Sequence, residues 1–287
     1  MLSAFGMLTQ SQVNREFVNP TAELQRRGEL LLFGDGRCAF ACGALALWHW
    51  FDEQFARMAR QAGAKAYQYP ALIARETLKR AGYFEAFGEM ATRVQANGAA
   101  QSHVLAPAVC YHCYAQFAGS RLVEPIVLTC VGKCFRHEPE GFESLGRLWE
   151  FTMREVVFLG PASWVEQQRR EWSSRVSEFA RSLNLEGEIG LASDPFFGNG
   201  GRGKKLLQQL KELKYELCLP VEAGRTLAVA SFNLHDTFFG ERFGLTLADG
   251  ATAHTGCVAF GLERWTLAFL AQRGIEAAAD LCRTSGL

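Results

Sequence analysis

Apolar residues recur every three or four positions between residues 44 and 62. This spacing places them on one side of an α-helix, and Gly63 is typical of a residue that follows a helix end. The same periodicity runs from Pro161 to Leu183, and proline is favoured in the first turn of a helix. The pattern therefore predicts two long amphipathic helices that pack on other elements.

Outside these helices, short apolar runs have the composition of β-strands. A strand is expected over residues 64–69, ended by Pro70, and a helix over 71–80, stopped by Gly82. The chain as a whole predicts an α+β fold, an antiparallel sheet flanked by helices. The other strand-like runs are residues 126–135, 147–159, 214–219, 226–233 and 255–260.

The chain has 287 residues, 48% of them hydrophobic, which is enough to bury a large core. No linker, low-complexity tract or internal repeat divides it. We therefore expect a single domain over residues 1–287, with residues 1–39 as an N-terminal extension. No signal peptide and no apolar run of membrane-spanning length is present, so a cytoplasmic location and no membrane contact are expected.

Charge and cysteine content narrow the chemistry further. Thirty basic and thirty acidic residues cancel, whereas proteins that grip nucleic acid usually carry a basic excess or patch. Nine cysteines are an odd number, and free or metal-bound thiols are expected rather than a disulfide framework.

The segment from Cys130 to Gly160 predicts a β-hairpin with a loop of about eleven residues. Arg136 and Glu138 close its first strand, and Arg147 opens the second. A guanidinium is a natural partner for phosphate.

Within the second strand, alternation places Trp149, Phe151, Met153 and Glu155 on one face. At about 3.3 Å per residue, Phe151 and Glu155 lie roughly 13 Å apart, about the span from adenine to the amino group of an aminoacyl-adenylate. An aromatic face is a natural partner for a nucleobase.

This hairpin resembles motif 2 of the class II aminoacyl-tRNA synthetases, most closely the seryl branch. Three further segments agree in order. Residues 213–220 resemble a later strand of the seryl enzymes, residues 230–244 resemble their next strand and helix, and residues 257–265 resemble motif 3. Pro70 resembles the motif 1 proline. The resemblance spans roughly residues 40–274 and implies the class II fold. It also implies a homodimer, since the motif 1 helix and strand form the family's dimer interface.

The resemblance implies an ATP site. Arg136 would hold the α-phosphate and the carboxylate side, and Arg147 and Arg264 the β- and γ-phosphates. Glu138 would bind the adenine amino group and Phe151 the ring, with Arg136 and Arg264 as the catalytic residues. Each arginine taken alone fits a solvated or ion-paired surface position better, and the presence of three at the motif positions reverses this preference. On periodicity alone, Phe151 is equally consistent with a core position.

The resemblance also implies a zinc site formed by Cys110, Glu155 and Cys257, as in the seryl-tRNA synthetases of methanogenic archaea and the related amino acid:carrier-protein ligases. Three protein ligands leave the fourth zinc position for substrate. The alternative is that these cysteines are small buried hydrophobes. Cys110 and Cys113 form a single CxxC with no second pair to complete a zinc knuckle.

Glu155, Asp194 and Asn233 are the expected contacts of the amino acid substrate, although Asp194 precedes a proline and fits a turn equally well. One family feature is missing. The glutamate that helps hold Mg²⁺ in seryl-type enzymes aligns near Leu227. Either Glu222 or another carboxylate takes its place, or the alignment is shifted in this segment.

The resemblance favours an amino acid:carrier-protein ligase that uses ATP, Mg²⁺ and Zn²⁺. It would activate glycine, alanine or serine and transfer it to the phosphopantetheine thiol of a carrier protein. The basic pair Arg169–Arg170 and residues 202–205 are candidate docking sites for an acidic carrier. Charging of tRNA is the alternative, against which stand the neutral charge and the lack of a tRNA-binding arm. A catalytically inactive paralogue that binds ligands is the third.

Overall fold

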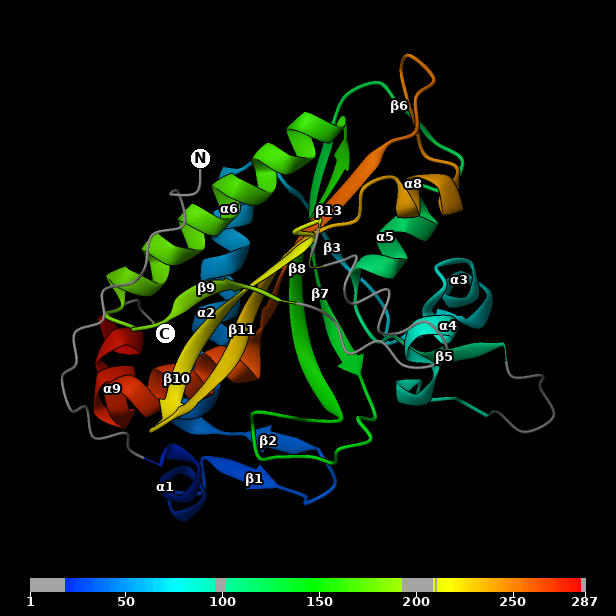
Figure 1. Ribbon diagram of the computed structural model, residues 1–287. Helices are drawn as coiled ribbons and strands as arrows, with labels where there is room; N and C mark the ends of the chain where they lie inside the picture. The colour runs from blue at the N-terminus through cyan, green and yellow to red at the C-terminus, as the bar shows by residue number, and fades with distance from the viewer. Residues whose placement is uncertain (1–18, 96–101, 193–208, 210, 285–287) are drawn as a thin grey trace.

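The centre of the molecule is a seven-stranded sheet with the strand order β3-β7-β8-β13-β11-β10-β9 (Figure 1). The computed structural model describes residues 19–95, 102–192, 209 and 211–284. Neighbouring strands are antiparallel except β3 and β7, which are parallel. The strands are β3 (Lys65–Gln68), β7 (Ile126–Phe135), β8 (Glu150–Gly160), β9 (Glu188–Leu191), β10 (Lys214–Glu222), β11 (Arg225–Leu234) and β13 (His254–Gly261).

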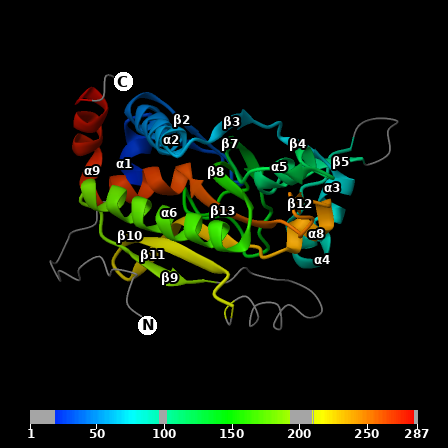
Figure 2. The same cartoon turned by 90° about the horizontal axis from the view of Figure 1, so that it is seen from above.

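Three long helices cover one face of this sheet (Figure 2). They are α2 (Cys42–Gln61), α6 (Ala162–Ser182) and α9 (Leu262–Thr284). Alternate strand residues such as Val156, Phe158 and Phe260 enter the core below them. Leu24 and Leu30, from the predicted extension, belong to the same core.

Shorter elements lie over the opposite face and around its edge. The helix α5 (Cys110–Gln116) and the helix α8 (Phe238–Phe243) pack on β7, β8 and β13 there. The remaining elements are α1 (Pro20–Arg26), β1 (Leu30–Leu32), β2 (Cys38–Phe40), β4 (Leu72–Ala74), α3 (Arg75–Arg80), α4 (Tyr83–Phe87), η1 (Gly88–Met90), β5 (His103–Leu105), β6 (Arg121–Leu122) and β12 (Thr246–Leu247).

The strand register brings distant polar residues together on this second face. Glu155 pairs with Ala259 across β8 and β13, and Cys257 pairs with Asn233 across β13 and β11. Because side chains alternate along a strand, Glu155 faces away from the long helices while Arg154 faces them. There Arg154 forms a largely buried ion pair with Asp52 of α2, at 2.6 Å from Nε to Oδ1.

The structure confirms both predicted long helices and the α+β fold. It differs from the predicted elements in three places. The helix expected over residues 71–80 begins only at Arg75, because residues 72–74 form β4, which pairs with β5 and buries Ile73. The sheet has one parallel edge pair. The second hairpin strand begins at Glu150, so Arg147 lies in the loop.

In the part of the chain described, every helix is too short or too polar to span a bilayer.

The core under the long helices is rich in aromatic rings. Phe55 is fully buried and stacks on Phe260 with ring centroids 4.1 Å apart. Trp265 and Phe179 complete its surroundings, at 5.2 and 5.5 Å. This cluster joins α2, α6 and α9 to β13.

Replacing Phe55 by alanine is expected to lower the free energy of unfolding by about 3–5 kcal/mol, because it leaves a cavity among rigid rings. Phe33→Ala, at a side chain that is 52% exposed, should change it by less than about 1 kcal/mol. Urea unfolding followed by circular dichroism measures both. Equal losses in the two variants would contradict the packing described.

Candidate active site

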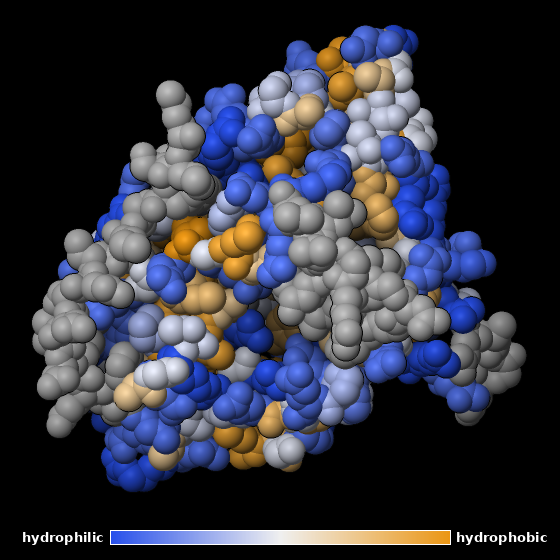
Figure 3. All heavy atoms as spheres, viewed as in Figure 1, coloured by the Kyte–Doolittle hydropathy of each residue, from blue (hydrophilic) through white to orange (hydrophobic). Residues whose placement is uncertain are grey.

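A cavity of about 980 Å³ opens over the second face of the sheet. Strands β8, β13, β11 and β10 form its floor, and α4, α5 and α8 contribute to its walls. Figure 3 shows a hollow near the middle of this side of the molecule, bordered by both hydrophobic and hydrophilic residues. Of the residues predicted for the site, Cys110, Arg136, Glu138, Arg147, Phe151, Glu155, Asn233, Cys257 and Arg264 all line this cavity.

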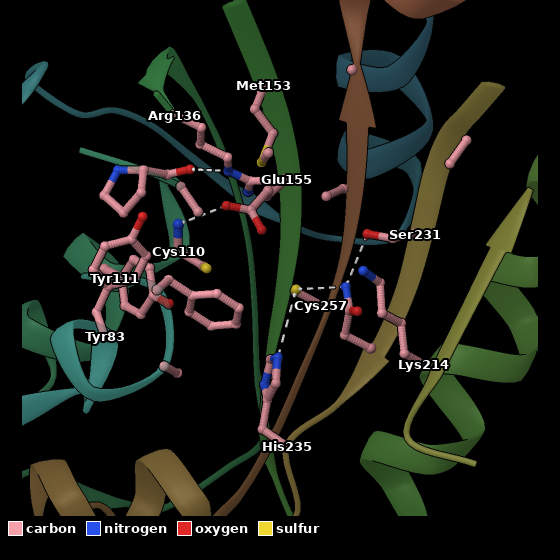
Figure 4. Close-up of a pocket in the computed structure, with 18 of the residues that line it drawn as sticks. Tyr83, Cys110, Tyr111, Arg136, Met153, Glu155, Lys214, Ser231, His235 and Cys257 are labelled. Carbon is pink, nitrogen blue, oxygen red and sulfur yellow. Dashed lines mark hydrogen bonds between the residues drawn. The ribbon is translucent and has the colours of Figure 1, made fainter. Parts of the chain in front are cut away.

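Three potential metal ligands meet in the depth of the cavity. One ligand atom from each of Cys110, Glu155 and Cys257 lies within 4.8 Å of the others, and all three residues are buried. Each comes from a different element, α5, β8 and β13. In Figure 4, Glu155 lies between the two cysteines, and the Cys110 backbone N–H donates to Glu155 Oε2 at 2.7 Å.

The surroundings of Cys110, Glu155 and Cys257 favour the protonated, uncharged form of each group. The pKa of Cys110 is raised well above its usual value, first by a hydrogen bond with Cys257 and next by burial. Burial also raises the pKa of Glu155, although the Cys110 N–H opposes this. The hydrogen bond with Cys110 lowers the pKa of Cys257, but burial and the Glu155 charge outweigh it and leave that pKa raised. A cation among the three ligands would reverse this preference.

The donor set fits zinc. Two thiolates and a carboxylate are common zinc ligands, at about 2.3 Å for sulfur and 2.0–2.2 Å for oxygen. A tetrahedral ion with such bonds needs its ligands roughly 4 Å apart or less, so small movements from separations within 4.8 Å suffice.

Nitrogen donors surround Cys257. Asn233 Nδ2 donates to Cys257 Sγ at 3.5 Å and to Ser231 Oγ at 3.0 Å. His235 Nε2 lies 3.9 Å from the same sulfur. The sequence predicts Asn233 as a substrate contact, and the structure places its side chain in the cavity lining beside Cys257.

Arg136 and Phe151 form one wall of the cavity. The Arg136 guanidinium lies over the Phe151 ring, 5.4 Å from its centroid, and Arg136 Nε donates to the Pro107 carbonyl at 2.9 Å. This bond fixes the position of the guanidinium at the wall of the cavity.

Arg264 is held by the backbone of two neighbouring segments. Its Nε donates to the Gly146 carbonyl at 2.9 Å and its Nη1 to the Ala228 carbonyl at 3.0 Å. Burial lowers its pKa, and the Glu138 charge opposes that shift. The guanidinium is therefore pre-positioned within the cavity.

Arg147, in the hairpin loop, pairs with Glu138 at 3.2 Å and with Glu140 at 2.8 Å. It does not open β8, because the loop folds back: the Glu143 N–H donates to the Arg147 carbonyl, and the Trp149 N–H donates to Gly36 instead of extending the strand. Trp149 accordingly is absent from the cavity lining, in contrast to Phe151, Met153 and Glu155.

The comparisons with known proteins agree with this geometry. The family model of the tRNA synthetase class II core domain (G, H, P, S and T) matches residues 93–273. The chain belongs to the class II tRNA synthetase core family. It is a ligase of that family, homologous to the amino acid–acyl-carrier-protein ligases.

Amino acid–acyl-carrier-protein ligase 1 of Bradyrhizobium diazoefficiens is 34% identical over 247 residues, covering 77% of this chain and 75% of the relative. The type-2 serine–tRNA ligase of Methanococcus aeolicus is also 34% identical, over 61% of this chain but only 35% of its own length. Among solved structures, M. kandleri seryl-tRNA synthetase, in complex with A. aeolicus tRNASec, superposes with a TM-score of 0.80 and 24% identity. That match covers 95% of this chain and 61% of the synthetase, and it supports the class II fold.

Several predictions for this class II site are not met or fall outside the description. Asp194 and residues 202–205 lie outside the described residues. Glu222 is exposed, pairs with Arg225 and does not line the cavity. Arg169 is buried and Arg170 pairs with Glu166, so these two arginines are not a free basic patch.

Other cavity residues carried no sequence signal of their own. The structure places Glu216 and Lys214 in the cavity as an ion pair of 2.9 Å, on the strand beside Leu227. Ala259 lies directly opposite Glu155. Others of this kind include Tyr83, Tyr111, Ser231 and His235. Lys214, Glu216 and Ser231 could have been found by applying strand alternation to β10 and β11.

Selective alkylation tests the burial of the site thiols. Cys42 is exposed, whereas burial raises the pKa of Cys38 to about 12 and that of Cys218 to about 11. Iodoacetamide at pH 8 is therefore expected to label Cys42 first and to leave Cys110 and Cys257 unmodified in the folded protein. Peptide mass spectrometry, with a denatured control in which every thiol reacts, measures this. Labelling of Cys257 as fast as Cys42 would contradict the burial.

Proposed function

We propose that this ligase activates a small amino acid with ATP and transfers it to the phosphopantetheine thiol of a carrier protein. The observation that carries the proposal is the sharing of one cavity by two sets of groups. One set, Cys110, Glu155 and Cys257, suits an amino group, and the other, built around Arg136 and Phe151, suits a nucleotide.

The nucleotide set would bind ATP. Phe151 offers a face for the adenine ring, and Glu138 accepts from its amino group. Arg136 and Arg264, fixed by backbone carbonyls, would neutralise the charge that develops on the α-phosphate as the amino acid carboxylate attacks it. Arg147 would serve the β- and γ-phosphates after releasing its carboxylate partners.

The amino acid set would be completed by zinc held by Cys110, Glu155 and Cys257. Zinc bound there would offer its fourth position to the neutral amino group of the substrate. Asn233 and Ala259 lie beside these ligands, and Asp194 remains a proposed contact. A residue opposite Glu155 as small as Ala259 is compatible with glycine, alanine or serine. Such a pocket separates two substrates that differ by one methyl group by only about 1–3 kcal/mol.

The products of the first step are aminoacyl-AMP and pyrophosphate. In the second step the carrier thiol attacks the aminoacyl carbonyl, a thioester forms, and AMP leaves. The homology to amino acid–acyl-carrier-protein ligases supports a carrier as the acceptor. A homodimer and a cytoplasmic location belong to the same proposal.

Class II synthetases use ATP with Mg²⁺, and this chain has Leu227 at the position of one usual carboxylate ligand. Glu222 lies outside the cavity lining, whereas Glu216 is within it. Glu216 is the proposed carboxylate for magnesium.

Amino acid-dependent exchange of pyrophosphate into ATP tests the first step. Exchange is expected with at least one of glycine, alanine and serine, and Arg136→Ala should lower the rate by about 10²- to 10³-fold. Arg170→Ala, an exposed arginine on α6, is the matched control and should leave the rate unchanged. No exchange with any small amino acid would end the proposal.

Transfer separates the acceptors in the same preparation. Labelled amino acid should appear on a phosphopantetheinylated carrier and not on total tRNA. Stable charging of tRNA alone would favour the function of the type-2 serine–tRNA ligases, and adenylate formation rules out an inactive paralogue.

The metal content of the wild type and of two cysteine variants tests whether Cys110, Glu155 and Cys257 hold zinc. The purified protein is expected to hold one zinc per chain, and Cys257→Ser should lose most of it together with amino acid activation. Cys42→Ser, at an exposed cysteine, is the control and should retain both. Metal content by mass spectrometry decides; wild-type protein that binds no zinc would refute this part of the proposal.

A further inference from the structure

The sulfur of Cys257 has two nitrogen neighbours, one on the adjacent strand β11 and one on the residue that follows this strand. Asn233 lies directly opposite Cys257, and its Nδ2 is 3.5 Å from Sγ. His235 follows two residues later, and its Nε2 lies 3.9 Å from the same sulfur. Figure 4 shows the His235 side chain pointing toward Cys257, which is itself only 3% exposed.

The other ring nitrogen of His235 faces two hydroxyl groups. Nδ1 lies 3.2 Å from Thr255 Oγ1 and 3.3 Å from Tyr114 Oη, and both residues are fully buried. A hydroxyl donates well to an unprotonated ring nitrogen, and a neutral imidazole carries its proton on the other nitrogen. With both hydroxyls donating to Nδ1, the ring proton would be on Nε2 and the N–H of His235 would point at Cys257 Sγ.

The imidazole is also held by packing. Its ring lies edge-on to Phe239 at 4.9 Å, and Phe239 stacks on Tyr114 at 4.2 Å. Tyr114 stands one helical turn after Cys110 on α5. A chain of contacts therefore runs from the helix that carries Cys110, through His235, to the strand that carries Cys257.

We propose that His235 is a positioning residue of the metal site, which orients Cys257 and donates an N–H to its thiolate. The proposal rests on the zinc site of the proposed function. Such an N–H withdraws electron density from the ligand sulfur, which keeps a bound dication a stronger acceptor for the substrate amine. Asn233 supplies the second N–H to the same sulfur.

His235 acts through Cys257 and is not a ligand itself. The ligand atoms that lie together belong to Cys110, Glu155 and Cys257, and the fourth position of zinc serves the substrate. A histidine in that position would close the site and convert it from a working one to a structural one.

Metal binding by the full-length protein tests the role without any activity measurement. Apo-protein is titrated with Co²⁺, recording the thiolate-to-cobalt charge-transfer band, and with Zn²⁺ in competition with a chromophoric chelator. His235→Ala is expected to weaken zinc binding by about 10- to 100-fold and to move the charge-transfer band to longer wavelength. His235→Gln, which keeps an N–H donor, should restore most of both.

Two further variants make the result specific. His103→Ala removes an exposed histidine on β5 and should match wild type. Thr255→Val keeps the imidazole but removes one of its supports, so it should move the band in the same direction by a smaller amount. It also keeps the test decisive if His235→Ala does not fold.

The outcomes separate this inference from the proposed function. Wild-type protein that binds neither ion refutes the zinc site. Wild-type binding with an unchanged band and affinity in His235→Ala overturns the role of His235 and leaves the zinc site standing. A change in the cobalt d–d bands that shows one protein ligand fewer in His235→Ala would make His235 a ligand and would also overturn the positioning role.

Discussion

Three acidic side chains from three different elements share a buried space, and the rest of the site follows from that constraint. Cys110, Glu155 and Cys257 would repel one another if all lost their protons in a medium of low dielectric. Without a cation they keep their protons more strongly than usual, as their raised pKa values express. A cation bound among them would compensate their negative charges. Its fourth coordination position would then be left for a substrate.

The sheet makes this convergence possible because one of its faces packs in the core and the other lines the cavity. One face, with Phe158 and Phe260, is sealed by long helices and aromatic packing. The other carries Glu155 and Cys257 on adjacent strands at a register set by the main-chain hydrogen bonds. A slip by one residue would send these side chains into the apolar core. The stability of the helical side therefore maintains the geometry of the functional side.

Much of this architecture could be predicted from the sequence, because the regular spacing of apolar residues in long segments identifies their secondary structure. The helices over residues 44–62 and 161–183 and the hairpin around Glu155 are of this kind. The short strand β4 was mistaken for helix, since three residues show no period and its partner β5 lies far along the chain. The prediction that Arg147 opens the second strand is wrong, because the loop forms its own turn through hydrogen bonds between Glu143 and Arg147. His235 could not be found, since its significance comes only from contacts with Tyr114 and Cys257.

X-ray absorption at the zinc edge tests the central claim most directly, because it reports the ligands of the ion itself. Purified protein is predicted to show two sulfur neighbours at about 2.3 Å and oxygen or nitrogen neighbours at about 2.0–2.2 Å. Addition of the cognate amino acid should alter only the oxygen and nitrogen shell. Four sulfur neighbours, no sulfur neighbour, or a spectrum indifferent to every small amino acid would contradict an open site formed by Cys110, Glu155 and Cys257.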